Sequence, residues 1–576
     1  MSVERRDGAE KPPLRIALLV DSLSQPQWVH DVVRDVAASG FAEIALVVKR
    51  EVPGPAPGAA GAPPKRNRWV NLFRNRDKLL YALYQKVDDR KFRTDPDPFA
   101  QADIGDLVAG APVLAVTPRT TKFCDYFEDA DVEAILAHRI DVAVRFGFRI
   151  MKGRALQIAR HGVWSWHHGS DLTNRGGPAG FWEVMEGQPV TGSILQVLTE
   201  ELDNGRVLYR SYASTNQFSV RKNKTNFYWK SSAFLMRKLR DLYCGGPEAP
   251  TVENGSGAPW TAYSNRLYVE PTTREMARGL VRLGGRFAAN KLRRSLGFEQ
   301  WLIAYTIGGW AGERDAAPNG TLYRCRPLVP PKDRFWADPF AVVHDGRRYI
   351  FFEEYLYATG KGHIAAVEVD KDGMRGPPRT VVERDYHLSY PFMFEWGGEH
   401  YMVPETEDNG TVELYRATSF PYEWEPARVL MSGVNATDAT LAEIDGRWWM
   451  FANMAVPGAS QWDELHLFHA PSPLGPWTPH PQNPIKSDVR SARPAGRLFR
   501  WRGAWHRPAQ DCSERYGFAM TINRIEQIDT STYREVEVSK ILPTWMPNII
   551  GTHTINASGD LTVVDALAWR PKLGRR

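Results

Sequence analysis

The chain has 576 residues, too many for one hydrophobic core, which predicts two or three domains. A net charge of +6, from 73 basic and 67 acidic residues, is too small over this length to indicate a nucleic-acid-binding protein. The four cysteines lie far apart with no C-x-x-C pair, so neither a disulfide framework nor a zinc ribbon is indicated, and we expect a cytoplasmic protein. No apolar run reaches about 18 residues, so no transmembrane helix is expected.

The first elements form a β-α-β pattern. Residues 14–20 are an apolar run that predicts a buried strand, 28–38 have a helical period, and 44–48 predict a second strand. A further apolar strand, 142–144, is followed by Phe146 and Gly147. Because ligands bind at the carboxyl ends of the strands in parallel sheets, we expect a site there.

Residues 162–177, "GVWSWHHGSDLTNRGG", place two histidines after a Trp-flanked run and end in Arg-Gly-Gly. His167 is followed eight residues later by Arg175-Gly176, and Asp203 lies in "EELDNGRVL". This pattern resembles the catalytic domain of the formyltransferase family, whose usual signature is Asn-x-His, then Arg-Gly, then a later Asp. The resemblance covers residues 14–215 and implies a Rossmann-like α/β fold.

The resemblance also implies a chemistry, the transfer of a formyl group from 10-formyltetrahydrofolate to an amine. His167 would serve as the acid or electrostatic partner of the tetrahedral oxyanion, and Asp203 would orient and charge its imidazole. Cofactor-binding roles would fall to Phe146, Gly147, Arg175 and Gly176. No metal ligands are predicted, because neither H-E-x-x-H nor a matching Cys/His spacing is present.

One residue departs from the family's signature. Ser165 occupies the position of the family's Asn, and losing an oxyanion donor typically costs about 10²–10³ in rate. The Ser165 site would therefore be slow, use a bridging water, catalyse a different transfer, or have lost its activity. The adjacent His168 is a second candidate for the missing donor.

Two basic segments follow. Residues 221–240 hold seven Lys or Arg and no acid, and we expect a helix packed on the sheet with a basic solvent face. Residues 276–294, "MARGLVRLGGRFAANKLRR", have six basic residues and no acid, with Arg278, Arg282 and Arg286 spaced four apart. The basic face of 276–294 is either simply solvated, or rests on an anionic membrane surface, or meets a phosphorylated substrate.

From residue 311 the chain changes to short β-rich runs broken by turns. Five similar openings recur about 50–60 residues apart, the spacing of propeller blades. We therefore expect an all-β five-bladed propeller, with "TLYRCRPL" closing the ring by pairing with the last blade. The openings place five side chains toward the central channel: Asp338, Tyr390, Asp438, Arg493 and His553.

This half resembles the propellers of family 43 glycoside hydrolases, and more closely the propeller that precedes the transferase domain of glucosamine inositolphosphorylceramide transferases. Those hydrolases work with three inner-strand carboxylates, whereas only two of the five openings here are acidic. Glu354 and Glu405 are candidates for a third carboxylate. Polar groups flanked by Trp and Tyr favour sugar binding over hydrolysis, although such groups also often just connect neighbouring blades.

Together these observations predict a multidomain protein. We expect a formyltransferase-like domain over 12–220, a basic helical connector over 221–310 and a propeller over 311–576. The predicted function is formyl transfer to the amine of a sugar-containing acceptor, with the propeller binding the glycan. The alternatives are a non-catalytic glycan-binding protein with a degenerate formyltransferase domain, and a glycoside hydrolase. No nucleic-acid partner is expected, and the acceptor and the oligomeric state are left open.

Overall fold

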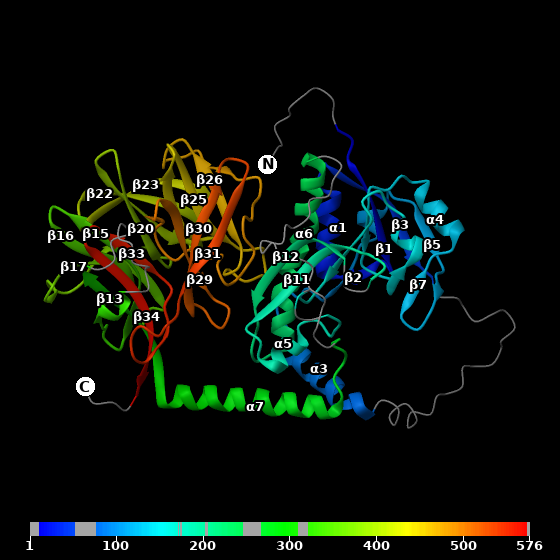
Figure 1. Cartoon of the computed structure of the whole chain (residues 1–576), viewed down its shortest axis with the longest axis horizontal. Helices are drawn as coiled ribbons and strands as arrows, with labels where there is room; N and C mark the ends of the chain where they lie inside the picture. Colours follow the sequence, from blue (N-terminus) through cyan, green and yellow to red (C-terminus); the bar gives the residue numbers. More distant parts are fainter. Residues whose placement is uncertain are drawn as a thin grey trace. The chain divides into compact units, whose positions relative to one another are not determined.

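The computed structural model describes residues 11–51, 76–170, 172, 175–201, 205–245, 267–308 and 321–572 (Figure 1). The chain forms two compact units, which confirms the multidomain prediction. The first unit consists of residues 1–211, 215–283 and 456–459, and the second of residues 212–214, 284–455 and 460–576.

A seven-stranded sheet forms the centre of the first unit. Its strands, in spatial order, are β12 (Arg206–Ser214), β11 (Val190–Val197), β10 (Val163–His167), β8 (Val142–Arg145), β1 (Leu14–Val20), β3 (Ala42–Arg50) and β5 (Val113–Val116). The five strands from β10 to β5 are parallel, and β11 runs antiparallel to β10. The strand order reverses beside β1, as in doubly wound sheets, where ligands bind at the switch point between β1 and β8.

Helices cover both faces of this sheet, because β1 is apolar on both sides. Ile16 and Leu18 join a core with α1 (Gln27–Ala37) and α6 (Val220–Gly245). Ala17 and Leu19 join the opposite core with α4 (Asp129–Leu136). The β-α-β unit predicted from the sequence is therefore confirmed by strand pairing and by burial on both faces.

Smaller elements complete the first unit. Three further helical elements lie between strands along the chain: η1 (Arg76–Lys78) and α3 (Leu79–Lys91) follow β3, and α5 (Phe181–Glu186) follows β10. Short strands form two small sheets: β2 (Ser24–Pro26) with β4 (Gln101–Asp103), and β6 (Arg119–Thr120), β7 (Cys124–Tyr126) and β9 (Ile150–Lys152). Two further turns of 3₁₀ helix are η2 (Asp106–Val108) and η3 (Gly153–Leu156).

The basic residues of α6 are not all on a solvent face, contrary to the expectation for 221–240. Arg221 and Lys230 are buried. The guanidinium of Arg221 forms an ion pair with Asp97, and its backbone N–H donates to Asp88 Oδ2 at 2.7 Å. An acidic partner from another segment makes burial of a guanidinium tolerable, and the sequence of α6 alone does not reveal such a partner.

The second unit is a propeller of five sheets. The first comprises β15 (Arg334–His344), β16 (Arg347–Leu356), β17 (Lys361–Asp370), β18 (Gly373–Met374) and β19 (Arg379–Val382). The second comprises β20 (Ser389–Trp396), β21 (Glu399–Thr406), β22 (Thr411–Ser419) and β23 (Glu423–Ser432). The third comprises β24 (Ala436–Ile444), β25 (Arg447–Met454), β26 (Leu465–Ala470) and β27 (Thr478–Pro479). The fourth comprises β28 (Phe499–Trp501), β29 (Ala504–Asp511), β30 (Ala519–Ile528) and β31 (Tyr533–Ile541).

The fifth sheet closes the ring and joins the two ends of the unit. It contains β13 (Gly297–Ile307), β14 (Arg326–Leu328), β32 (Ile549–Gly551), β33 (Ile555–Ser558) and β34 (Leu561–Pro571). β13 pairs with β34 along its whole length, whereas the "TLYRCRPL" segment supplies only β14, which pairs with β13. The propeller strands therefore begin at Gly297 and not at 311. The sequence hides this boundary because β13 continues from a helix without a Gly-Pro turn between them.

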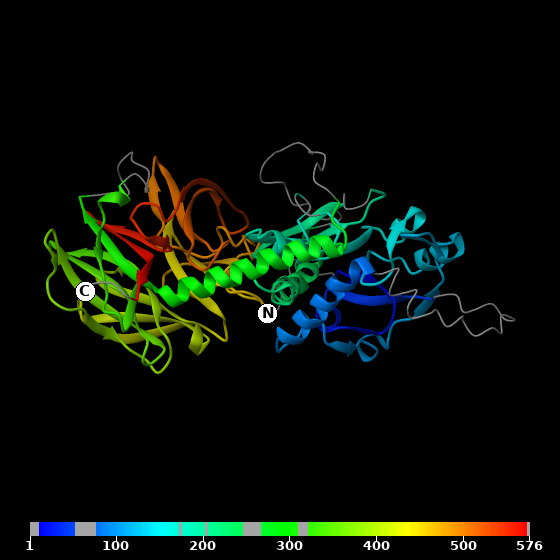
Figure 2. The same cartoon turned by 90° about the horizontal axis from the view of Figure 1, so that it is seen from below.

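The connector is the 24-residue helix α7 (Thr273–Leu296), continuous in Figure 2. Only Met276, Gly279 and Leu283 of α7 are buried. Among the described helices none is sufficiently long and apolar to cross a membrane.

Candidate functional site

The inner strands of three propeller sheets share one backbone feature. Asp338, Tyr390 and Asp438 each have a left-handed φ, of 51°, 42° and 53°. Each lies at a register shift between the first and second strands of its sheet. Bulges of this kind turn a side chain out of the regular alternation and recur beside binding sites. The repeated openings seen in the sequence are thus equivalent positions in the fold.

A cavity of about 190 Å³ lies at the centre of the propeller. All five sheets or their connecting loops contribute lining residues: Trp301, Phe335, Ala337, Asp338, Glu353, Tyr355, His387, Ser389, Glu405, Arg493, Tyr516 and His553. Three of the five predicted channel residues, Asp338, Arg493 and His553, line this cavity. Tyr390 lies behind it, where its hydroxyl bonds Thr440 Oγ1 at 2.8 Å and accepts from the Gly496 N–H at 2.7 Å.

Arg493 is held by carboxylates on two neighbouring sheets. Its Nε lies 2.5 Å from Asp438 Oδ2, and one terminal nitrogen lies 3.3 Å from Glu405 Oε2. Gln510 also donates to Asp438 Oδ2, at 2.9 Å. Burial alone would lower the pKa of Arg493, but Asp438, Tyr516 and Glu405 together outweigh burial and the pKa is raised. Asp438 therefore lies behind the cavity as the counter-ion of Arg493.

His553 lies between two other carboxylates. Its Nδ1 is 2.5 Å from Asp565 Oδ2 and its Nε2 is 3.5 Å from Asp338 Oδ1. Burial alone would lower the pKa of His553, but these carboxylates raise it, so that the imidazolium form is favoured. Burial raises the pKa of Asp338 to about 6, although His553 opposes this shift. The indole of Trp301 stacks on the His553 ring with a centroid distance of 4.1 Å.

The same three residues are the metal-binding candidate of the described chain. Ligand atoms of Asp338, His553 and Asp565 lie within 4.8 Å of one another, and all three residues are buried. Both imidazole nitrogens, however, already face carboxylate oxygens.

Among the carboxylates that line the cavity, Glu353 has the least positive charge close to it. It is 5% exposed, and His387 Nε2 lies 3.5 Å from its Oε1, but burial lowers the pKa of His387 and so favours the uncharged ring. Burial and the neighbouring Asp338 and Glu405 raise the pKa of Glu353 well above its ordinary value. Glu354, which the sequence offered as a third carboxylate, does not line the cavity: it accepts from Trp336 Nε1 at 2.9 Å.

A second hollow, of about 400 Å³, shares Trp301, Phe335 and Tyr516 with the central cavity. Glu299, Tyr357, Arg515 and Leu567 complete its lining. Aromatic faces thus lead into a charged centre, a combination that suits a ligand with apolar ring faces and polar edges.

The first unit has a smaller cavity, of about 80 Å³, at the carboxyl ends of β8 and β10. Its lining is Arg145, Ile150, Met151, Trp166, His167, Gln196, Leu198, Thr199, Glu201 and Gly205. The hydroxyl of Ser165 is buried and accepts from Arg145 Nε at 3.0 Å. Asp203 lies outside the described residues, so its proximity to His167 stays a prediction.

His168 faces a different environment from His167. Its ring stacks on Tyr228 with a centroid distance of 3.8 Å, and Nε2 lies 3.1 Å from Ser231 Oγ. Burial, with a smaller contribution from His167, lowers the pKa of His168 to about 3. At neutral pH His168 is therefore an uncharged ring packed among aromatic side chains.

The strand ends near the switch point are tightly packed. Phe146 stacks on Trp166 with a centroid distance of 5.2 Å, and a Cβ on Gly147 would lie 2.4 Å from the Asp21 backbone nitrogen. Pockets that hold ligands of the size of a folate measure about 300–1,000 Å³. The described residues at this edge do not form such a pocket, and 10-formyltetrahydrofolate binding stays a prediction.

Arg175 and Gly176 belong to a loop that pairs with a distant segment. The Tyr268 N–H donates to the Arg175 carbonyl at 2.9 Å, and the Gly177 N–H donates to the Tyr268 carbonyl at 3.0 Å. Gly176 has φ 97°, and a Cβ there would lie 2.1 Å from the Tyr268 carbonyl oxygen. This close backbone approach explains the glycine, whatever the loop binds.

Comparison with known proteins identifies relatives of the propeller. Residues 329–546 match the family "Glucosamine inositolphosphorylceramide transferase 1, N-terminal". This match confirms the predicted resemblance of the second half to these transferases. Glucosamine inositolphosphorylceramide transferase 1 of Arabidopsis thaliana is 38% identical over 236 residues, which are 40% of this chain and 31% of that protein. The Oryza sativa subsp. japonica protein of the same name is 39% identical over 209 residues, 36% of this chain and 28% of that protein. The match thus spans about a third of the length of these relatives.

Solved structures resemble the two halves only distantly. A thermostable family 43 glycoside hydrolase is 15% identical, with a TM-score of 0.28, and the match covers 36% of this chain and 76% of that one. Glycinamide ribonucleotide transformylase 1 from Symbiobacterium toebii is 14% identical, with a TM-score of 0.26, and covers 40% of this chain and 89% of that one.

Sequence reasoning missed Glu353 and the aromatic residues of the cavity lining, Trp301 and Tyr516 among them, as well as Asp565 behind it. Trp301 lies on β13, in the segment assigned to the connector, and the continuous apolar run in "EQWLIAYTI" was the signal that could have revealed this buried strand. Asp565 lies on β34, whose run "LTVVDALAW" contains one carboxylate in an otherwise apolar strand. A buried acid in such a strand requires a partner, here His553.

Proposed function

We propose that the propeller binds the sugar portion of a glycoconjugate that takes part in a transferase reaction. The observation that carries this proposal is the central cavity, in which stacked aromatic rings meet a set of charged groups held in fixed positions. Sugars offer apolar ring faces to the aromatic residues and hydroxyls to the carboxylates and the guanidinium. The names of the matched relatives, which are transferases acting on a glycolipid, support the same substrate class.

The charges of the cavity favour binding over hydrolysis. Glycoside hydrolysis needs one carboxyl group as an acid and another as a base or nucleophile. Here Asp438 is engaged by Arg493 and Gln510, while Asp338 accepts from Thr554 Oγ1 at 2.7 Å and faces His553. We therefore expect no release of nitrophenol from nitrophenyl arabinofuranosides or xylosides. Turnover that disappears in an Asp338→Asn variant would favour the hydrolase instead.

The binding test uses the full chain and a panel of free sugars. Glucosamine, N-acetylglucosamine, inositol, xylose and arabinose are titrated by calorimetry and by thermal shift. A ligand at 100 times its Kd stabilises the native state by about 2.7 kcal/mol, so a sugar that binds this cavity will raise the melting temperature of the second unit. Absence of saturable binding to every sugar and to a glycan array would contradict the proposal.

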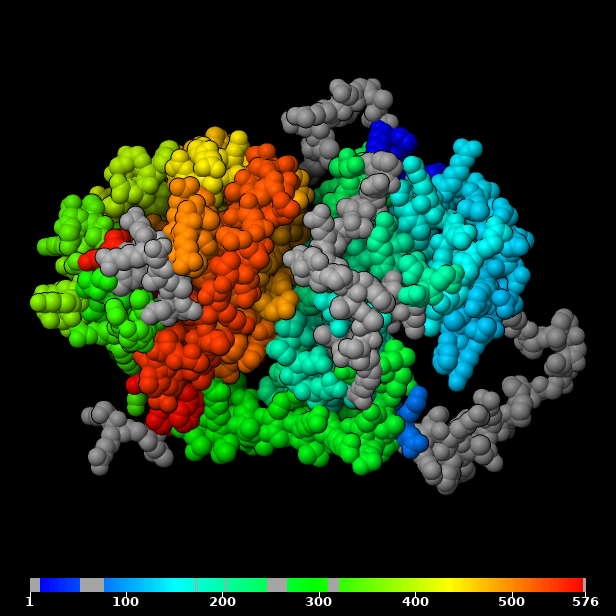
Figure 3. Space-filling model, viewed as in Figure 1, coloured from blue at the N-terminus to red at the C-terminus, as the bar shows by residue number. Residues whose placement is uncertain are grey.

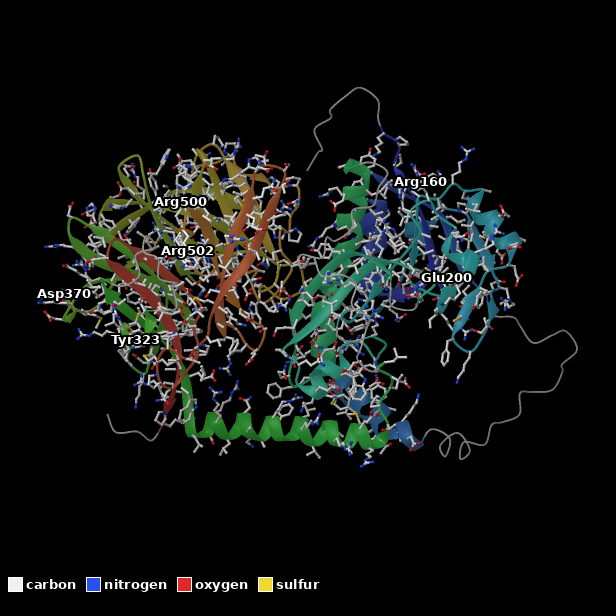
Figure 4. All side chains as sticks on the ribbon, viewed as in Figure 1. Arg160, Glu200, Tyr323, Asp370, Arg500 and Arg502 are labelled. Carbon is white, nitrogen blue, oxygen red and sulfur yellow. The ribbon has the colours of Figure 1, made fainter. Side chains whose placement is uncertain are left out.

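Variants locate the site. Trp301→Phe shortens the aromatic wall of the cavity, and Glu405→Gln removes a charge with little change in volume, and we expect each to weaken sugar binding at least several-fold. Tyr323→Phe is the matched control, because Tyr323 is exposed and does not line the cavity (Figure 4). Equal effects of Tyr323→Phe and Trp301→Phe would place the sugar elsewhere.

Formyl transfer by the first unit is the second candidate function, and one observation favours it: His167 lines a cavity at the carboxyl end of a parallel sheet. Ser165, the residue in the position of the family's Asn, already accepts a hydrogen bond from Arg145. Purified chain supplied with 10-formyltetrahydrofolate and an amino sugar should release tetrahydrofolate, and His167→Ala should not. Folate binding without turnover would indicate the degenerate domain, and no folate binding would exclude the cofactor.

A further inference from the structure

Helix α7 is exposed along most of its length, which distinguishes it from α1 and α6. Its buried residues, Met276, Gly279 and Leu283, lie on one side of the first half. Beyond Leu283 no residue of α7 is buried. In the space-filling view the green side chains of α7 lie at the molecular surface (Figure 3).

Large apolar side chains lie on the exposed side of α7. Val281 is 76% exposed, Leu292 60% and Leu296 56%. At 100° per residue these three positions fall within about 60° of one another on the helix circumference, roughly opposite Met276 and Leu283. Ala288 and Ala289 lie next to them and are also exposed. Isolated exposed apolar residues are common, but a stripe along one helix face indicates a partner surface.

Cations lie on and beside this face. At 100° per residue the exposed Arg274 and Arg278 fall in the same sector as the stripe but nearer the start of the helix. Arg282 lies about 40° beyond Leu296, and Lys291 lies about 80° from Val281 on the other side. Neither Arg278 nor Arg282 has an ion pair with any described residue. Residues 276–294 contain six basic residues and no acid, so no charge within the segment offsets them. The partner surface must therefore be anionic as well as apolar.

We propose that α7 is a membrane-surface helix that binds anionic lipid, with its apolar stripe among the acyl chains and its arginines at the headgroups. A helix of this kind lies in the plane of the interface, and an apolar stripe flanked by Lys or Arg is the arrangement that suits it. A folded protein partner would supply carboxylates but need not offer an apolar layer along the second half of the helix, whereas an anionic bilayer offers both. The proposal is independent of the sugar cavity, because α7 residues line neither propeller cavity.

The test is flotation of the full chain with vesicles of phosphatidylcholine alone or with 30% phosphatidylserine. We expect binding to the anionic vesicles, weak binding to the neutral ones, and release as salt rises, since the Debye length falls from about 10 Å at 0.1 M to about 3 Å at 1 M. Equal binding to both vesicle types, or no binding to either, would overturn the proposal.

Two sets of substitutions separate the charge from the stripe. Arg278→Gln with Arg282→Gln should weaken binding to anionic vesicles roughly five-fold for each cation removed. Leu292→Ser with Leu296→Ser should weaken it roughly ten-fold, because each leucine then loses its burial in the bilayer. All four residues are exposed, so we expect the melting temperature and circular dichroism of these variants to match wild type.

The control removes two arginines elsewhere. Arg160→Gln with Arg500→Gln changes exposed residues of the first and second units, and neither residue is on α7 (Figure 4). This variant should bind vesicles as wild type does. Equal loss in this variant would show that net charge alone drives binding and would overturn the assignment to α7. Tight binding to a DNA 20-mer without vesicle binding would also overturn it, since the partner would then be a polyanion without an apolar layer.

Discussion

Removing the Arg493 guanidinium should destabilise the propeller strongly. Arg493→Leu puts a shorter, apolar side chain in place of arginine and leaves the carboxylates of Asp438 and Glu405 buried without their cation. Removing one partner of a buried ion pair typically costs about 3–5 kcal/mol. Each kcal/mol shifts the melting temperature of a domain of 150–250 residues by about 2–4 °C, and the second unit is larger than this, so we expect it to melt roughly 6–10 °C lower.

The pH dependence of this loss follows from the same charges. Arg493 opposes the rise in the pKa of Glu405 that burial and Asp438 cause, so without Arg493 this pKa will rise further, and the folded variant will release the Glu405 proton later than the unfolded chain does. Its stability will then fall as pH rises above about 4–5, the range in which an unfolded Glu ionises, until the raised pKa is passed. The destabilisation should accordingly be smaller at pH 5 than at pH 8.

Scanning calorimetry of the full chain measures these effects, because the two units need not melt together. Arg500→Leu, an exposed arginine on the same unit, is the matched control and should change the transition by less than about 0.5 kcal/mol. Adding Asp438→Asn to Arg493→Leu should recover part of the loss, since one uncompensated charge is removed. Strictly additive losses in the double variant, or a loss no larger than that of the control, would refute the reasoning.

Three further predictions concern single residues. The folded state holds the pKa of His168 near 3, below the unfolded value of about 6.5, so the first unit should lose stability as pH falls from 6.5 toward 3. Between neutral pH and pH 4 the His168→Phe variant should lose on the order of 3 kcal/mol less of its free energy of unfolding than wild type does, as measured by melting at both pH values. Glu353 changes stability in the opposite direction with pH, because its raised pKa lowers the free energy of unfolding as pH rises above about 4.5. Glu353→Gln should therefore stabilise the second unit by about 1–3 kcal/mol at pH 8 and little at pH 4, and destabilisation at pH 8 would contradict this. Gly176→Ala should cost on the order of 2–3 kcal/mol in urea melts, because its Cβ would meet the Tyr268 carbonyl oxygen, whereas Gly40→Ala, also left-handed but in open space, should cost about 1 kcal/mol.

The local sequence pattern predicts the individual strands, hairpins and helices of this fold, because each of these elements depends on residues close in sequence. The run from Leu14 to Val20 is apolar on both faces and forms β1 with the predicted bounds. The recurrent openings at Asp338 and Asp438 revealed the blades, since each blade repeats the same bulge and hairpin. The basic segment 276–294 lies within one helix, as its period predicts.

The central site could be predicted only in part, because its members come from different sheets. Sequence spacing placed Asp338, Arg493 and His553 at the cavity, but could not show that Asp438 is the counter-ion of Arg493. Nor could it distinguish Glu353 from Glu354, because the choice depends on which face of β16 meets the channel. Likewise, nothing near His168 in the sequence indicates that Tyr228 stacks on it.

The sequence by itself therefore determined the elements, their repeats and the types of side chain available, since periodicity and turn chemistry act over a few residues. The tertiary structure alone decided which charges meet. The closing pair β13 and β34 unites segments more than 250 residues apart, and with them Trp301 and Asp565 reach His553. Electrostatic and stacking energies depend on such distances in space, and separation along the chain carries no information about them.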